Sequence, residues 1–306
     1  MAKKKKHTLL KVVGTTAVVG GASYMAAGYY IFRNLFDMKN SNLNTKEKAV
    51  ADEEKREWLN HSIKDDEFID SYDGIKLHGL RISNHEDSHK WIILSHGYNA
   101  YSQDMLDYMF ESYQKGYNAL AIDQRGCGMS DGTYSGLGWN EHYDLISWIN
   151  YLITIDPEAE ICLLGLNYGG AAVLYALGEF LPTNVKCAIE DGSFSDAKEF
   201  VSHATQRYLK VDGSFLIPSI NLYVKNFLKY SLTEVSMKRA LKQSSIPTLF
   251  IHGMEDELIP ASHVFDNYYA CESEKELFTI DGAKGNETKT SEGYFEAIFN
   301  FVGQYM

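Results

Sequence analysis

The sequence predicts one α/β domain with a mostly parallel, doubly wound sheet and a small helical cap, preceded by one N-terminal transmembrane helix. Apolar, β-branched runs alternate with longer helical patterns from about residue 66 to the end of the chain. This alternation is typical of a parallel sheet with helices on both faces. The 306 residues are 45% hydrophobic and 23% charged, a composition that supports one large packed core.

The N-terminal segment is predicted to anchor the protein. No charged residue occurs from Val12 to Phe32, an apolar run of 21 residues, and a helix of about 20 apolar residues spans a bilayer. Lys3–Lys6 and Lys11 precede this run, and such positive charge stays on the cytoplasmic side. We therefore expect a basic cytoplasmic flank (1–11), a single-pass anchor in the cell membrane (12–32) and an extracytoplasmic domain.

Two further points concern this end of the chain. The alternative to an anchor is a cleaved signal peptide, because small residues at 20–23 and 26–27 would suit a signal peptidase. Residues 33–65 are polar and carry charges of both signs, which predicts a linker that runs into a first surface helix.

The domain, residues 66–306, is predicted to contain seven strands and five main helices. The strands are Ile75–Ile82, Trp91–Ser95, Ala119–Asp123, Ile161–Gly165, Cys187–Glu190, Thr248–His252 and Leu277–Ile280. The helices are Gln103–Gln114, Asn140–Thr154, Gly169–Phe180, Ser262–Ala270 and Glu292–Tyr305. Between them, residues 192–246 break the rhythm and predict a helical cap over the strand ends, whose aromatic residues either line a pocket or attach the cap to the sheet.

Composition excludes several classes of function. The net charge of −12 and the pI of about 5.3 argue against nucleic acid, whose phosphates need a basic face. The four cysteines and ten histidines show no metal-ligand spacing, so we expect packing cysteines and no metal. No cofactor is expected, because GLNYGG lacks the glycine pattern of a dinucleotide site.

Four motifs follow predicted strands in order. They are WIILSHGYNA, DQRGCGMSDG, GLNYGG and LFIHGMEDELIP. Together with GWNEHYDLISWINYL they resemble the α/β-hydrolase superfamily, and most of all its membrane-anchored bacterial branch of cell-surface or serine aminopeptidase-like hydrolases. The resemblance covers roughly residues 66–305. It implies a Ser-His-Asp triad, with the serine on a G-x-S-x-G turn between a strand and a helix.

The nucleophile position departs from that pattern. The turn reads Gly165-Leu166-Asn167-Tyr168-Gly169, so both glycines that allow the tight backbone turn remain. Asn167 replaces the serine, and a carboxamide is not a usable nucleophile at neutral pH. The sequence therefore predicts that this turn is catalytically inert.

The base position also departs from the resemblance. Asp256 matches the acid, but the loop that should hold the histidine reads DGAKGNE, with Gly285 nearest the expected position. No histidine occurs from Val264 to Met306. The resemblance also implies an oxyanion hole built from the backbone N–H groups of Tyr98 and Tyr168. These donors do not depend on side-chain identity, so a carbonyl or carboxylate could still bind there.

Three other arrangements of residues could supply catalysis. Ser130 lies in Gly128–Gly132, which matches G-x-S-x-G literally but follows a different strand, and we interpret it as structural. His263 lies seven positions after Asp256 and is expected to start a helix. Ser193 or Ser195 follows another strand, with His203 in the cap as the conceivable base.

Two missing triad members favour a catalytically degenerate hydrolase that acts as a binding or scaffolding module. Its ligand would be a small acyl or peptide group, and its membrane contact would be the N-terminal helix. The alternative is an active esterase or peptidase with an unorthodox nucleophile or base. A third possibility is a tethered partner of another surface protein, in which the pocket plays no part.

Overall fold

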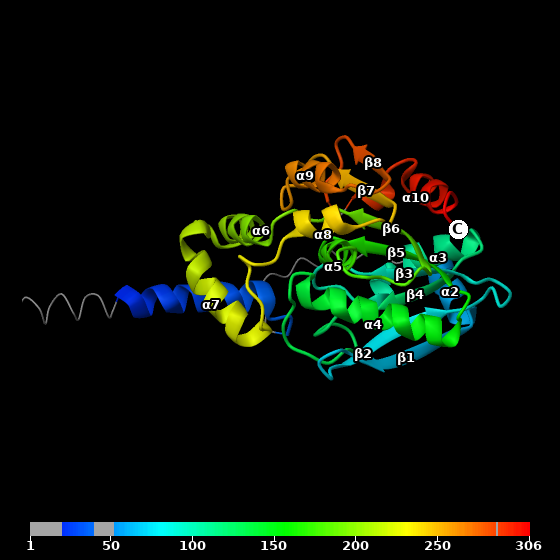
Figure 1. The fold of residues 1–306 in the computed structure, drawn as a ribbon, viewed down its shortest axis with the longest axis horizontal. Coiled ribbons are helices and arrows are strands. Elements are labelled where there is room, and N and C mark those ends of the chain that lie inside the picture. Colours follow the sequence, from blue (N-terminus) through cyan, green and yellow to red (C-terminus); the bar gives the residue numbers. More distant parts are fainter. Residues whose placement is uncertain (1–19, 40–51, 286) are drawn as a thin grey trace, which may run out of the picture.

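A computed structural model describes residues 20–39, 52–285 and 287–306. Its centre is an eight-stranded sheet with the order β1-β2-β4-β3-β5-β6-β7-β8 (Figure 1). β1 and β2 are antiparallel to their neighbours, and all pairs from β4 to β8 are parallel. The strands are β1 (Lys64–Asp70), β2 (Lys76–Ile82), β3 (Lys90–Ser95), β4 (Asn118–Ile122), β5 (Glu160–Leu166), β6 (Val185–Asp191), β7 (Thr248–Gly253) and β8 (Lys275–Ile280).

Helices cover both faces of the sheet, as the strand–helix alternation predicts. One face packs against α4 (Trp139–Ile155), α5 (Tyr168–Ala176), α8 (Met237–Gln243) and α9 (Ser262–Ala270). The other face packs against α2 (Glu53–His61), α3 (Leu106–Gln114) and α10 (Tyr294–Val302). A short 3₁₀ turn, η1 (Ser102–Met105), precedes α3, and another, η4 (Thr288–Thr290), precedes α10. The central strands are buried on both faces, which explains their continuous apolar runs.

The strand β1 was missed by the sequence reasoning. Its seven residues read KDDEFID and are mostly exposed, so they carry no apolar run. β1 lies at the edge of the sheet and pairs with β2 alone. Charged residues are common on such edges because they discourage pairing with other chains. The missed strand therefore belongs to the class that hydrophobic patterning detects least well.

The predicted cap is helical. It contains α6 (Ala197–Ala204), a π-helical turn η2 (Thr205–Leu209), a 3₁₀ turn η3 (Ser214–Leu216) and α7 (Ile217–Leu228), and it ends with α8. Because it follows the end of β6, the cap lies over the carboxyl edge of the parallel strands. This edge is where open α/β sheets bind their ligands.

Residues 20–36 are helical, and we call this segment the N-terminal helix. It lies beside α7 (Figure 1), where Tyr24 Oη donates to Phe215 O at 2.9 Å and Tyr223 Oη donates to Met25 O at 3.1 Å. A Cβ on Gly28 would lie 2.0 Å from Ser219 Oγ. The helix therefore approaches α7 as closely as a glycine permits.

The C-terminal turns of the N-terminal helix belong to the domain core. Ile31, Phe32, Leu35 and Phe36 are buried, and the Phe32 ring contacts Tyr134, Phe227 and Phe36. The sequence assigned residues 33–65 to a linker, but residues 33–37 pack inside the fold and α2 and β1 begin before residue 66. Of the predicted anchor, residues 12–19 lie outside the described residues. Within the described ranges, no helix is both long enough and apolar enough to cross a membrane.

The packing of Phe32 allows a direct test of whether the C-terminal turns of the N-terminal helix belong to the folded domain. Phe32→Ala removes a fully buried ring and should destabilise the full-length protein by about 3–5 kcal/mol. Tyr30→Ala, two residues away but exposed, should change the stability by less than about 0.5 kcal/mol. Denaturant unfolding in mild detergent would compare the two. Equal stabilities would mean that the N-terminal helix does not contribute to the folded domain.

Candidate functional site

The turn between β5 and α5 keeps the geometry that a nucleophile requires. Asn167 connects the two elements with φ 47° and ψ −105°, a strained backbone for a residue other than glycine. A Cβ on Gly165 would lie 2.3 Å from Gly169 O, and a Cβ on Gly169 would lie 2.1 Å from Ser95 O. Close backbone packing therefore requires both glycines, Gly165 against the first turn of α5 and Gly169 against the end of β3.

The side chain of Asn167 lies between two loops. Its Nδ2 donates to Gly192 O at 3.3 Å, after β6. Its Oδ1 lies 2.9 Å from the point that a Cβ on Gly97 would occupy, after β3. The side chain is half-buried. A carboxamide thus occupies the position from which a serine hydroxyl would attack, and it offers a donor and an acceptor but no nucleophile.

The acid position and the expected base position meet in space. The Asp256 Oδ1 after β7 accepts the N–H groups of Leu258 at 2.7 Å and Ile259 at 2.9 Å. Gly285 follows β8, and a Cβ built on it would lie 2.0 Å from Asp256 Oδ2. Gly285 is absent from the residues with positive φ, so its backbone accepts an L side chain. A side chain at position 285 would therefore project directly onto the Asp256 carboxylate.

The side chains of the two residues expected to supply oxyanion donors contact each other. Tyr98 follows β3 and Tyr168 opens α5, and their ring centroids are 4.8 Å apart. Tyr98 Oη donates to Asn34 O at 3.2 Å, which ties this loop to the N-terminal helix. His96 shapes the same loop, because its Nε2 accepts the N–H of Gln124 at 3.0 Å and its Nδ1 therefore donates to Gly97 O at 2.7 Å.

Comparison with known proteins identifies the fold. The structure superposes on an esterase from Pyrococcus furiosus, Pf2001, with a TM-score of 0.67 over 85% of this chain and 98% of that chain, at 21% identity.

The chain therefore has the α/β-hydrolase fold.

Sequence comparison finds a family model and relatives of low identity. The family model "Serine aminopeptidase, S33" matches residues 86–222. The uncharacterized protein YqkD of Bacillus subtilis is 24% identical over 237 residues, which are 76% of this chain and 77% of YqkD. The uncharacterized membrane protein YNL320W of Saccharomyces cerevisiae is 25% identical over 237 residues, which are 75% of this chain and 76% of the yeast protein. The chain is thus similar in fold to esterases and similar in sequence, over residues 86–222, to the S33 serine aminopeptidase model.

The second G-x-S-x-G match in this chain, Gly128–Gly132, closes a loop and is not a nucleophile turn. Ser130 is buried, and its Oγ donates to Asp123 O at 2.6 Å while it accepts the N–H of His78 at 2.8 Å. The imidazole of His78 instead donates through Nδ1 to Asp123 Oδ2 at 2.7 Å. The hydroxyl of Ser130 is engaged in closing a loop, so it is not a nucleophile. This agrees with the interpretation from the sequence.

A serine–histidine contact occurs where the sequence only partly suggested it. Ser195 Oγ lies 2.8 Å from His263 Nδ1 and 3.3 Å from Asp266 Oδ2. His203, the base suggested from the sequence, instead places its Nε2 3.0 Å from Glu257 O. Burial lowers the pKa of His263, so its ring is neutral at pH 7 and able to accept a proton. Ser193, the other candidate, is fully buried.

The buried carboxyl of Asp191 escaped the sequence reasoning. Asp191 ends β6, and its Oδ2 accepts Thr288 Oγ1 at 2.8 Å and Tyr294 Oη at 2.6 Å. Burial raises the pKa of Asp191 to about 7, and the nearby charge of Asp256 acts in the same direction. Its main-chain oxygen accepts the N–H of Asn167 at 2.8 Å. Asp191 is therefore hydrogen-bonded to Asn167 through its main chain, and the pKa of its carboxyl group responds to the charge of Asp256.

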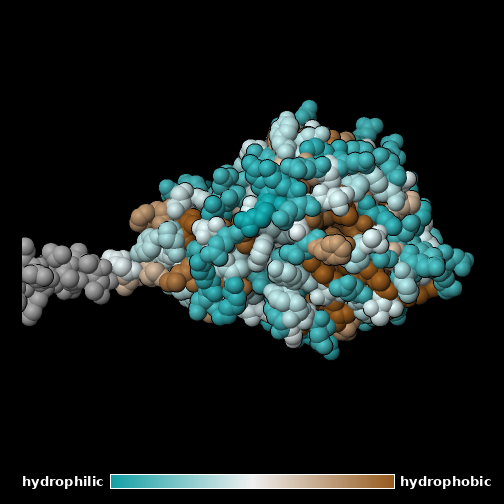
Figure 2. Space-filling model, viewed as in Figure 1, coloured by the Kyte–Doolittle hydropathy of each residue, from teal (hydrophilic) through white to brown (hydrophobic). Residues whose placement is uncertain are grey.

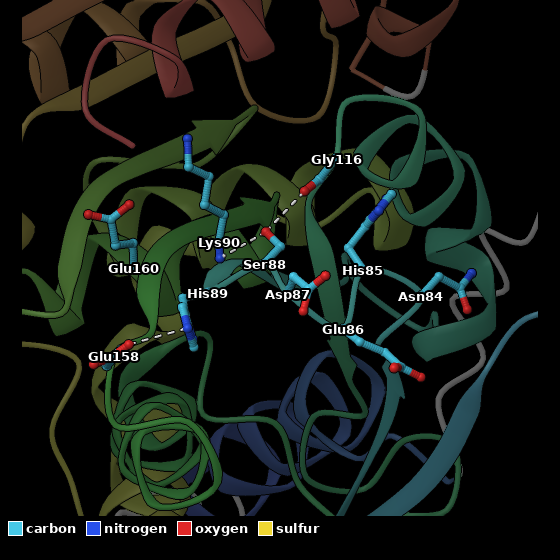
Figure 3. A pocket seen from close by; sticks show the side chains of 10 residues that line it. All are labelled: Asn84, His85, Glu86, Asp87, Ser88, His89, Lys90, Gly116, Glu158 and Glu160. Carbon is cyan, nitrogen blue, oxygen red and sulfur yellow. Dashed lines mark hydrogen bonds and ion pairs between the residues drawn. The ribbon is translucent and has the colours of Figure 1, made fainter.

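The pocket in Figure 3 lies away from this site. It is lined by Asn84–Lys90, Gly116, Glu158 and Glu160, which surround the starts of β3 and β5. The candidate site lies at the opposite, carboxyl ends of these strands. Among residues 20–39, 52–285 and 287–306, no group of three or more His, Cys, Asp or Glu side chains is arranged to hold a metal ion.

The raised pKa of Asp191 predicts a pH-dependent stability. The folded-state pKa of about 7 exceeds the ordinary value of 3.8, so the folded protein holds this proton more tightly than the unfolded chain. The stabilisation is complete below about pH 4 and is lost as the pH rises through 7, with an upper limit of roughly 4 kcal/mol. Asp191→Asn should therefore flatten the loss of stability between pH 5 and pH 8.

The measurement is denaturant unfolding at both pH values, with Asp281→Asn as the matched control. Asp281 is exposed in the turn after β8, so its substitution should leave the wild-type pH dependence unchanged. The assignment fails if Asp191→Asn and Asp281→Asn show the same profile.

Proposed function

We propose that this protein is a catalytically degenerate α/β hydrolase that acts as a binding or scaffolding module. The observation that carries the proposal is the pair of substitutions at the reacting positions. The carboxamide of Asn167 lies on the strained turn between β5 and α5, and position 285, beside Asp256, carries no side chain. Loss of a triad nucleophile costs on the order of 10⁶ in kcat. The remaining oxyanion donors and binding contacts support ligand binding better than turnover.

The geometry favours a small acyl or peptide ligand with a carbonyl or carboxylate group. The proposed donors to the ligand oxygen are the backbone N–H groups of Tyr98, which follows β3, and of Tyr168, which follows Asn167 at the start of α5. The Asn167 carboxamide can donate to or accept from such a ligand, depending on its orientation. Asn167 therefore replaces a reacting group with a binding group of similar reach.

We also propose that the protein is attached to the cell membrane through its N-terminal apolar segment, with the domain outside the cytoplasm. The uncharged run from Val12 to Phe32 and the lysines before it support this proposal. The description of the yeast relative as a membrane protein is consistent with it. No cofactor, metal or nucleic acid is part of the proposal.

Restoring the two missing groups should restore activity. The natural full-length protein in detergent should not hydrolyse p-nitrophenyl acetate above background. The double variant Asn167→Ser, Gly285→His should exceed it at least roughly tenfold, a small part of the ~10⁶ of an intact triad. The Asp256 carboxylate must shift to admit the new ring, because the Cβ at position 285 approaches its Oδ2 to 2.0 Å.

Two controls accompany the double variant. Asn167→Ser alone lacks the base and should gain little, and Asp256→Ala added to the double variant should remove the gain. Turnover by the natural protein that disappears in Asp256→Ala would contradict the proposal.

A second candidate function rests on the Ser195–His263 contact of 2.8 Å. In this candidate the protein is an active esterase or peptidase whose nucleophile is Ser195, which lies just before α6 of the cap. Under our first proposal, a fluorophosphonate probe should leave the natural protein unlabelled and should label the double variant at position 167. Labelling of the natural protein that vanishes in Ser195→Ala and in His263→Gln would favour the second candidate.

A further inference from the structure

Large apolar side chains are exposed together at one end of the molecule. Phe215 is 72% exposed and Leu222 is 54% exposed on the cap, and Tyr30 is 55% exposed on the N-terminal helix. Figure 2 shows apolar residues at this end of the molecule. Tyr29, Val211 and Phe227 are exposed in the same elements. Single exposed apolar residues need no explanation, but a contiguous group marks an interaction surface.

Exposed residues of η3 and α7 form a stripe. Phe215 in η3 and Pro218, Leu222 and Lys225 in α7 are exposed at spacings of three and four residues, and Lys229 is exposed directly after α7. Helical periodicity places such residues along one outward face. An apolar face that ends in lysines is the pattern of a helix that lies in a membrane interface. We call this face, together with Tyr29 and Tyr30, the cap stripe.

Ring contacts join the N-terminal helix to η3 and α7 of the cap. Tyr24 packs against Phe215 with ring centroids 5.1 Å apart, and Tyr29 packs against Tyr223 at 5.2 Å. The chain therefore enters the domain beside the exposed stripe. Whatever receives the preceding apolar residues must also lie next to the cap.

The number of apolar residues before the first contact with the domain supports this arrangement. The N-terminal helix contacts the cap from Tyr24 onward, which leaves Val12–Ser23 as the apolar residues that precede the first contact with the domain. These 12 residues are fewer than the roughly 20 that span a bilayer as a helix. The hydrocarbon core is about 30 Å thick. A short segment of this kind draws its attached domain into the interface.

We propose that the cap stripe rests on a lipid bilayer, with Phe215 and Leu222 inserted at the level of the headgroups and Lys225 and Lys229 facing anionic lipid. This inference rests on the proposed membrane attachment and adds to it a fixed orientation of the domain. The contact of Tyr98 Oη with Asn34 O links the oxyanion loop to the same helix. The candidate site would therefore lie close to the membrane, where an amphiphilic acyl ligand is concentrated.

Site-directed fluorescence on the full-length protein tests the orientation. Leu222→Cys and Phe215→Cys, each in a Cys127→Ser background, are labelled with bimane and reconstituted into vesicles of phosphatidylethanolamine and phosphatidylglycerol. The remaining native cysteines are buried. Phe180→Cys is the matched control, because Phe180 is an apolar residue that is fully exposed and lies before β6, at the opposite edge of the sheet.

Nitroxide-labelled lipids should remove most of the bimane fluorescence at positions 222 and 215 and leave position 180 unaffected. Co-flotation of the protein with vesicles separates the two levels of the argument. Flotation without quenching at position 222 would overturn the cap orientation and leave membrane attachment standing. Loss of flotation would overturn both. A blue-shifted label at position 222 without lipid quenching would show that a second protein copy covers the stripe, and would also overturn the inference.

Discussion

The close approach of α5 to the end of β3 is the constraint on which the site depends. Gly169 lies so near Ser95 O that any Cβ would collide with it at 2.1 Å. This contact fixes the tight turn after β5 and forces Asn167 into its positive φ. Because the strain arises from backbone packing, it persists although the residue that would use it for catalysis is absent.

The carboxyl edge of the sheet brings distant residues into one constellation. β5, β6 and β7 are parallel neighbours, so the loops that carry Asn167, Asp191 and Asp256 meet at the same edge. Position 285 follows β8 and faces Asp256. The fold therefore brings together the positions that the resemblance to hydrolases assigns to a triad, with Asn167 and Gly285 at two of them.

The cap and the N-terminal helix form one packed unit over this edge. The aromatic residues of the cap divide into two groups. Some rings, such as Phe200 and Phe194, are buried against Tyr168, which attaches the cap to the site. Others, such as Phe215, face outward. The cap thus contributes to the core on its inner side and presents an apolar surface on its outer side.

The sequence by itself determined the class of fold, seven of the eight strands, and the presence of Asn167 and Gly285 where the resemblance places a serine and a histidine. Those features depend on local patterns, namely apolar runs, strand-to-turn motifs and the identity of single residues. Only the tertiary structure revealed the charged edge strand β1, because its stability comes from pairing with β2 and not from burial. The Asp191–Tyr294 hydrogen bond and the Ser195–His263 contact join residues separated by 103 and 68 positions. The N-terminal helix is the clearest case: its composition predicts a membrane segment, and only packing against α7 decides which of its turns belong to the domain.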